Sequence, residues 1–208
     1  RKGSYGYFAL DITDPEAPKF LWRINGKNEA TEPGTSVLPA AARATQVAEL
    51  GESWSDPRLG KVKTSDADTS GTPALFIGGG FSATNDTGKA VLAINTLTGV
   101  PVKIFKNDTD STPAGTNIGG MNYSIPSTIR IMDLDRNGFI DRLYVGDAGG
   151  QLWRIGRFTE SDGVIPFPFP NGDENITNWR GQKIFTAGCN EANCTDNVDN
   201  NTNSLIDE

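Results

Sequence analysis

The fold is decided by residues 72–105, which read TPALFIGGGFSATNDTGKAVLAINTLTGVPVKIF. Short apolar runs rich in β-branched and aromatic residues alternate here with Gly, Asn, Asp and Thr, which are the residues that turns require. The run ALFIGGG stops at glycines, where a backbone turns with positive φ or passes close to another backbone. AINTLTG predicts a strand followed by a tight turn, and KIF predicts the returning strand. The stretch therefore predicts antiparallel hairpins.

Two further segments share this pattern. Residues 5–24 (YGYFALDITDPEAPKFLWRI) and 141–158 (DRLYVGDAGGQLWRIGRF) each contain a strand, a polar turn and a second strand with an aromatic residue near its end. The chain has 24 Gly and 12 Pro among its 208 residues, and this abundance of turn formers favours an all-β fold. Repeated hairpins of this kind predict a partial, modified β-propeller of antiparallel blades with loop insertions. Because the three segments are unevenly spaced, a two-sheet sandwich is the alternative.

Polar stretches at residues 26–53, 106–123 and 159–178 are expected to be the loop insertions. Within the first of them, residues 39–50 predict a short Ala-rich helix that ends at Gly51, and an irregular loop is the alternative. Three tryptophans are expected to pack in the core of the blades: Trp22, Trp153 and Trp179.

Charge and composition exclude several classes of function. Acidic residues outnumber basic ones by 26 to 19, which argues against a nucleic-acid partner, because such a partner requires a basic face. The chain has no His, so histidine catalysis and His-based zinc or copper sites are excluded within it. No apolar run is long enough to insert into a membrane. The first residues run directly into a strand pattern, and we therefore expect the chain to be a piece of a longer protein.

Oxygen-bearing groups stand at alternate positions of residues 133–141, which read DLDRNGFID. Such a loop suits a hard cation with six to eight oxygen ligands, and Ca²⁺ better than Mg²⁺ because the ring is flexible and supplied by the protein. Position 12 is Tyr144, not the Glu of an EF-hand, so the pattern predicts a calcium loop between strands. A solvated acidic turn is the alternative. The candidate ligands are Asp133, Asp135, Asn137, the backbone carbonyl of Phe139, and Asp141, with Gly138 permitting the bend.

Residues 188–208 differ in composition from the propeller segment predicted at residues 1–187. They form a Cys-, Asp- and Asn-rich insertion or tail. Cys189 and Cys194 are spaced for a local disulfide, which would indicate an oxidising compartment, and two free thiols are the alternative. A weaker match to the same calcium template gives a second candidate site, with an unstructured polar tail as its equal alternative. Its ligands would be Asp199, Asn201, Asn203, the carbonyl of Leu205, and Asp207.

Five stretches resemble, in this order, the C-terminal β-propeller of the PilY1/PilC family of adhesins, which are located at the tip of type IV pili. They are ALDITDPEAPKFLWRI, ESWSDPRLGKV, ALFIGGGFSATNDTGKAVLAINTLTG, the acidic loop running into DRLYVGDAGGQLWRI, and NWRGQKIFTA. The resemblance implies a bacterial protein exported through the periplasm to the cell surface. It also implies contacts with minor pilins and with host or abiotic surfaces, and roles in pilus assembly and twitching motility. In that family, calcium occupancy is linked to the balance of pilus extension and retraction.

Two other functions stay open. The turns ALDITDP and AINTLTG also look like the docking turns of quinoprotein dehydrogenase propellers, which are enzymes that bind pyrroloquinoline quinone. No cofactor pocket with a catalytic Asp can be assigned, because Asp11 and Asp147 are expected to be strand-end and turn residues, so we expect no enzyme. In the other alternative the propeller is a scaffold that calcium only stiffens. The calcium affinity separates the two cases, because a site that is always saturated cannot switch.

Overall fold

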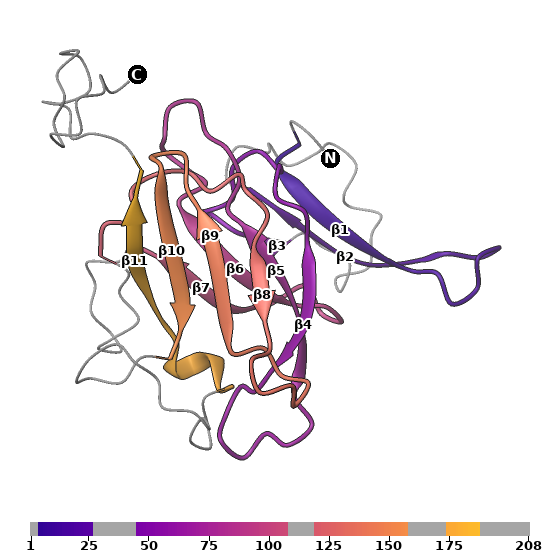
Figure 1. Cartoon of the computed structure of the whole chain (residues 1–208). Coiled ribbons are helices and arrows are strands. Elements are labelled where there is room, and N and C mark those ends of the chain that lie inside the picture. Colours follow the sequence, from indigo (N-terminus) through magenta and orange to yellow (C-terminus); the bar gives the residue numbers. More distant parts are fainter. Residues whose placement is uncertain (1–3, 27–44, 108–118, 158–173, 188–208) are drawn as a thin grey trace, which may run out of the picture.

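The computed structural model describes residues 4–26, 45–107, 119–157 and 174–187. In this part of the chain the strands form three sheets, and helical structure is limited to a 3₁₀ turn, η3 (Ile176–Asn178) (Figure 1). The first sheet contains β1 (Gly6–Asp11), β2 (Lys19–Asn25) and β3 (Thr45–Gln46). The second contains β4 (Arg58–Val62), β5 (Thr72–Gly78), β6 (Ala90–Asn95) and β7 (Pro101–Lys106). The third contains β8 (Arg130–Met132), β9 (Arg142–Gly146), β10 (Gln151–Gly156) and β11 (Arg180–Thr186).

Each four-stranded sheet is an antiparallel meander in chain order, β4-β5-β6-β7 and β8-β9-β10-β11. The predicted hairpins are confirmed, because β1 pairs with β2, β6 with both β5 and β7, and β9 with β10. Sequence patterning alone did not predict β4. Its residues, RLGKV, are mostly exposed and show no apolar alternation, so the strand forms because β5 offers a free edge.

The second sheet packs against a core on each of its faces. Successive residues of its strand β6 point to opposite faces, because a strand has a two-residue period. On β6, Val91 and Ala93 belong to the core that is shared with the third sheet. Leu92 and Ile94 point the other way and pack in a second core with Trp22 of the first sheet. A sheet covered on both faces by neighbouring sheets is the arrangement of a propeller blade. The tryptophans predicted for the core are all buried: Trp22, Trp153 and Trp179.

The predicted helix is wrong over residues 45–50, and residues 39–44 lie outside the described ranges. Thr45 and Gln46 instead form β3, which pairs parallel to the end of β2. The backbone N–H of Val47 then donates to the carbonyl of Asn25 at 2.8 Å. The Val47 side chain is buried in the core of the first sheet. Long-range pairing and burial outweigh the helix propensity of the preceding alanines, because an isolated short helix has little stability of its own.

Candidate metal centre

The acidic loop joins β8 to β9, so the antiparallel pairing of these strands brings its two ends together. Met132 pairs with Arg142 in the ladder, and the N–H of Asp141 donates to the carbonyl of Met132 at 2.8 Å. The loop is also tied to the second sheet, because the N–H of Ile140 donates to the carbonyl of Lys61 on β4 at 2.8 Å. The loop that carries the candidate ligands is therefore a closed ring, because both of its ends are fixed.

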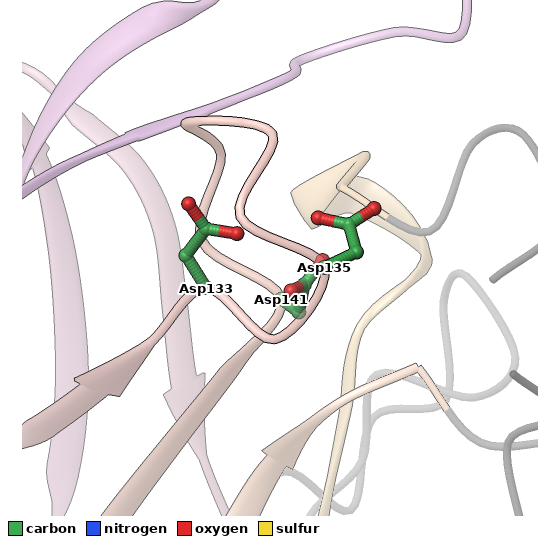
Figure 2. Close-up of side chains that lie close together, drawn as sticks. All are labelled: Asp133, Asp135 and Asp141. Carbon is green, nitrogen blue, oxygen red and sulfur yellow. The ribbon is translucent and has the colours of Figure 1, made fainter. Parts of the chain in front are cut away.

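Three of the predicted ligands converge inside this ring. Asp133, Asp135 and Asp141 each offer one carboxylate oxygen, and these oxygens lie within 4.8 Å of one another. Figure 2 shows the three side chains on the loop, with Asp133 directly after β8 and Asp141 directly before β9. Three negative charges held this close repel one another unless positive charge is supplied between them.

Asp141 is the buried member of the cluster, with 4% of its surface exposed. Its Oδ2 accepts a hydrogen bond of 2.6 Å from the N–H of Leu134. Its Oδ1 is buried and has no hydrogen-bond donor. Burial is the main cause that raises the pKa of the Asp141 carboxyl from its usual 3.8 to about 6, and the negative charges of Asp135, Asp133 and Glu174 add to the rise, opposed by the Leu134 hydrogen bond. A buried oxygen without a donor is costly, so this atom is poised to accept a cation.

Backbone donors of the loop shape the other two carboxylates. The N–H groups of Asn137 and Gly138 donate to the two oxygens of Asp133 at 3.2 and 2.9 Å. The Asn137 N–H also donates to Asp135 Oδ1 at 3.1 Å. Gly138 has φ of +90°, a backbone conformation that favours glycine, which explains why the bend occurs there. These backbone hydrogen bonds define the shape of the ring.

Phe139 follows the bend, and its side chain anchors the loop to the second sheet. The ammonium groups of Lys61 and Lys63 lie 5.1 and 4.9 Å from the centre of its ring. Gly71, directly before β5, leaves room for the ring, because a Cβ atom there would lie 2.4 Å from Phe139 Cε1. The predicted ligand at this position is the backbone carbonyl, and the packing of the ring fixes the backbone that carries it.

Sequence reasoning missed a fourth carboxylate at the edge of the loop. Glu174 lies in the connection between β10 and β11 and is only 7% exposed. Its Oε1 accepts a hydrogen bond of 2.6 Å from the side-chain amide of Asn137. Burial by itself would raise the pKa of Glu174, but its own backbone N–H, the Asn137 amide and Lys63 hold that pKa below its usual range. No local pattern marks this residue, because its partner stands 37 positions earlier in the chain.

The donor set fits a hard divalent cation. All the predicted ligand atoms are oxygens, which Ca²⁺ prefers, and three of the groups are carboxylates that lie together in the fold. The buried Oδ1 of Asp141, which has no hydrogen-bond donor, is a second observation that favours a cation at this position. The second predicted site lies outside the described residues (Asp199, Asn201, Asn203, Leu205 and Asp207), and so do Cys189 and Cys194.

The two aspartates considered for an enzyme site are both engaged in local turns. Asp11 ends β1 and accepts hydrogen bonds from the N–H and hydroxyl of Thr13 at 2.9 and 2.6 Å. Asp147 lies in the turn between β9 and β10, and the indole N–H of Trp153 donates to it at 2.8 Å. Both positions agree with the interpretation as strand-end and turn residues.

In the described part of the chain, no helix is long and apolar enough to cross a membrane.

Comparison with known proteins identifies what this arrangement resembles. The family model described as PilY1 beta-propeller domain matches residues 1–187. The type IV pilus biogenesis factor PilY1 of Pseudomonas aeruginosa strain PAO1 is 27% identical over 197 residues, and a PilY1 homolog of Xylella fastidiosa is 30% identical over 186 residues. These alignments cover 90% and 89% of this chain but only 14% and 11% of the two relatives.

A solved structure gives the same picture of the fold. The crystal structure of the Pseudomonas aeruginosa PilY1 C-terminal domain aligns with a TM-score of 0.53 and 24% sequence identity. The alignment covers 86% of this chain and 30% of that one. At this identity the likeness supports the fold, and it agrees with the partial propeller predicted from the repeated hairpins.

Proposed function

The chain belongs to the PilY1 β-propeller family, and on that premise we propose that it is a calcium-binding propeller segment of a type IV pilus-associated surface adhesin. Its similar relatives are named as type IV pilus biogenesis factors. In the proposed role the segment supports pilus assembly and the control of retraction, and it acts outside the cell, at the pilus tip. Its partners there are minor pilins and the host or abiotic surface to which the cell attaches.

The observation that carries the calcium part of this proposal is the buried Oδ1 of Asp141, which has no donor and belongs to a cluster of three carboxylates. A protein rarely keeps such an atom without a partner. A bound Ca²⁺ would supply the positive charge that the cluster lacks. Its ligands would be Asp133, Asp135 and Asp141, completed by the side-chain oxygen of Asn137 and the carbonyl of Phe139.

The proposed consequence is that calcium fastens the third sheet to the second. The loop leaves β8, returns into β9, and contacts β4 through the Ile140 to Lys61 hydrogen bond. An ion that stabilises the loop therefore stabilises the junction of two neighbouring blades. At a free calcium concentration about a hundred times the dissociation constant, binding adds about 3 kcal/mol to the free energy of unfolding.

The test is a calcium titration by calorimetry on the wild type and on Asp133→Ala, with thermal melting followed in calcium and in chelator. We expect the wild type to bind one ion more than Asp133→Ala and to melt at a higher temperature in calcium, and we expect Asp133→Ala to lose that ion and the gain in melting temperature that it causes. Asp86→Ala is the matched control, because Asp86 is an exposed turn aspartate that accepts from Ser82 and Thr84 far from the loop in sequence.

Identical behaviour of the wild type and Asp133→Ala in calcium and in chelator would make the loop a solvated acidic turn and would remove the calcium part of the proposal. If calcium binds, the dissociation constant separates two roles. A value near the calcium level outside the cell supports a switch that responds to that level. A much lower value supports a structural ion that is always bound.

A further inference from the structure

Glu174 lies next to the candidate ligand Asn137 although the two residues are far apart in the chain. The Asn137 side-chain nitrogen donates to Glu174 Oε1 at 2.6 Å and to Asp135 Oδ2 at 2.9 Å. The carboxylate oxygens of Asp133, Asp135 and Asp141 form the compact cluster, and Glu174 stands outside it. Glu174 is therefore placed to contact Asn137, which is a candidate ligand of the ion, and not the ion itself.

The hydrogen bond from Asn137 to Glu174 distinguishes the two ends of the side-chain amide. An ionised carboxylate can only accept hydrogen bonds, so Glu174 selects the nitrogen end of the amide. The oxygen end is then left for the loop, where Asn137 Oδ1 accepts from the N–H of Phe139 at 2.8 Å. An amide fixed in this way keeps its oxygen, the atom that a hard cation requires, on the side of the loop backbone.

Glu174 is itself fixed by Lys63, the residue that follows β4. The N–H of Lys63 donates to the Glu174 carbonyl at 2.9 Å, and the N–H of Ile176 donates back to the Lys63 carbonyl at 2.9 Å. The Lys63 ammonium lies 3.3 Å from Glu174 Oε2. Glu174 is therefore buried, its backbone is held by hydrogen bonds to Lys63, and its Oε2 faces the Lys63 ammonium without a hydrogen bond. A buried carboxylate fixed in this way can orient another group.

We propose that Glu174 is a positioning residue of the calcium site, which orients the Asn137 amide for the ion and couples ion binding to the residues that lead into η3. The inference rests on the proposed calcium function. Segments from three places in the chain then meet at one centre: the β8–β9 loop, the end of β4, and the residues that lead into η3. Outer groups of this kind change the affinity of a metal site about 10-fold to 100-fold when they are removed.

The test measures calcium dissociation constants by calorimetry for Glu174→Ala, Glu174→Gln, Asn137→Ala and the double variant Asn137→Ala with Glu174→Ala. We expect Glu174→Ala to weaken binding about 10-fold. Glu174→Gln should retain more of the affinity, because both variants lose the charge but Gln keeps an oxygen that can accept from Asn137. In the Asn137→Ala background, Glu174→Ala should cause little further loss, because the positioning residue then has nothing to orient.

Glu49→Ala is the matched control. Glu49 also pairs with a lysine, Lys106, at 2.8 Å, and its carbonyl accepts from Gly88, next to β6 rather than next to the acidic loop. This variant should melt at a lower temperature than the wild type but bind calcium with unchanged affinity. Melting in chelator, measured for every variant, shows whether each one is folded at the temperature of the titration.

Several outcomes would overturn the inference. Equal weakening by Glu174→Gln and Glu174→Ala would assign the effect to charge alone. A full additional loss in the Asn137→Ala background would show that Glu174 acts independently of Asn137. An unchanged dissociation constant in Glu174→Ala, with binding still abolished by Asp133→Ala, rejects the positioning role and leaves the proposed function intact. Absence of calcium binding in the wild type removes the calcium part of the proposed function and the inference with it.

Discussion

Two aspartate-containing turns flank strand β9, and their carboxylates differ in the hydrogen-bond donors that they receive. In the turn after the strand, Asp147 accepts from the N–H groups of Gly149 and Gln151 at 2.9 Å each, and from the Trp153 indole at 2.8 Å. In the loop before the strand, Asp141 has one oxygen with a donor and one buried oxygen without any. The donors around Asp147 complete its turn, whereas Asp141 keeps one buried oxygen without a donor, which is the atom that the proposed ion would contact.

The difference does not come from residue type or burial alone. Both carboxylates lie at the ends of the same strand and in partly or fully buried surroundings. It comes from the number of N–H groups that each turn directs at its carboxylate. The Asp147 turn supplies a donor to each carboxylate oxygen, whereas the acidic loop gathers several carboxylates with fewer donors, which favours a cation there.

The largest effect is expected for Asp147→Ala. The change leaves two backbone N–H groups and the indole N–H of the buried Trp153 without their acceptor, and we expect a loss of about 4 kcal/mol in the free energy of unfolding. The loss should be the same in calcium and in chelator, as measured by denaturant unfolding. A loss that calcium relieves would contradict the division into a structural turn and an ion-binding loop.

The next effect concerns Asp141→Asn in chelator, followed against pH. Because the pKa of Asp141 is raised in the fold to about 6, its protonated form favours folding, and that contribution is lost as the pH rises from about 4 to about 6. The amide of Asn imitates the protonated carboxyl at every pH. Above pH 6 and without calcium, Asp141→Asn should therefore be more stable than the wild type, by at most about 3 kcal/mol.

The measurement for this prediction is the difference in unfolding free energy between the two proteins at several pH values. Taking the difference cancels the carboxyls whose pKa is lowered in the fold, such as Asp68 and Asp86, which contribute the opposite slope. The same variant should lose the stabilisation by calcium. A pH-independent difference, or a variant that is less stable than the wild type in chelator, would show that Asp141 has a partner within the chain.

The smallest effects are expected for the glycines of the two turns. Gly138 and Gly150 both have positive φ, +90° and +73°. A Cβ on Gly138 would have no heavy atom within 4 Å, whereas one on Gly150 would lie 2.8 Å from the carbonyl oxygen of Ala187. Thermal melting in chelator should show a loss of about 1 kcal/mol for Gly138→Ala, from backbone strain alone.

Gly150→Ala should cost about 2 kcal/mol, because it adds a steric conflict with the carbonyl of Ala187, the residue after β11, to the same strain. Equal losses of unfolding free energy for the two variants would mean that a Cβ atom is accommodated as easily in the turn after β9 as in the loop before it. That result would weaken the contrast between a closed structural turn and an open ion-binding loop.

The sequence by itself determined the features that depend on near neighbours. The short apolar runs in residues 72–105, each ended by turn-forming residues, predicted β5, β6 and β7, since strand propensity and turn formation depend on residues that are close in sequence. The spacing of DLDRNGFID likewise placed Asp133, Asp135 and Asp141 in one ring, because a loop that bends at Gly138 brings alternate residues together.

Only the tertiary structure decided the features that depend on distant parts of the chain. The strand β3 replaced a predicted helix because β2 offered it a partner, and β4 formed on the edge of β5 without any apolar alternation. The burial of Asp141, and the arrival of Glu174 at Asn137 from the β10–β11 connection, follow from how the sheets stack. Hydrogen bonds and burial between residues that are far apart in sequence leave no local pattern, because their energy exists only once the chain has folded.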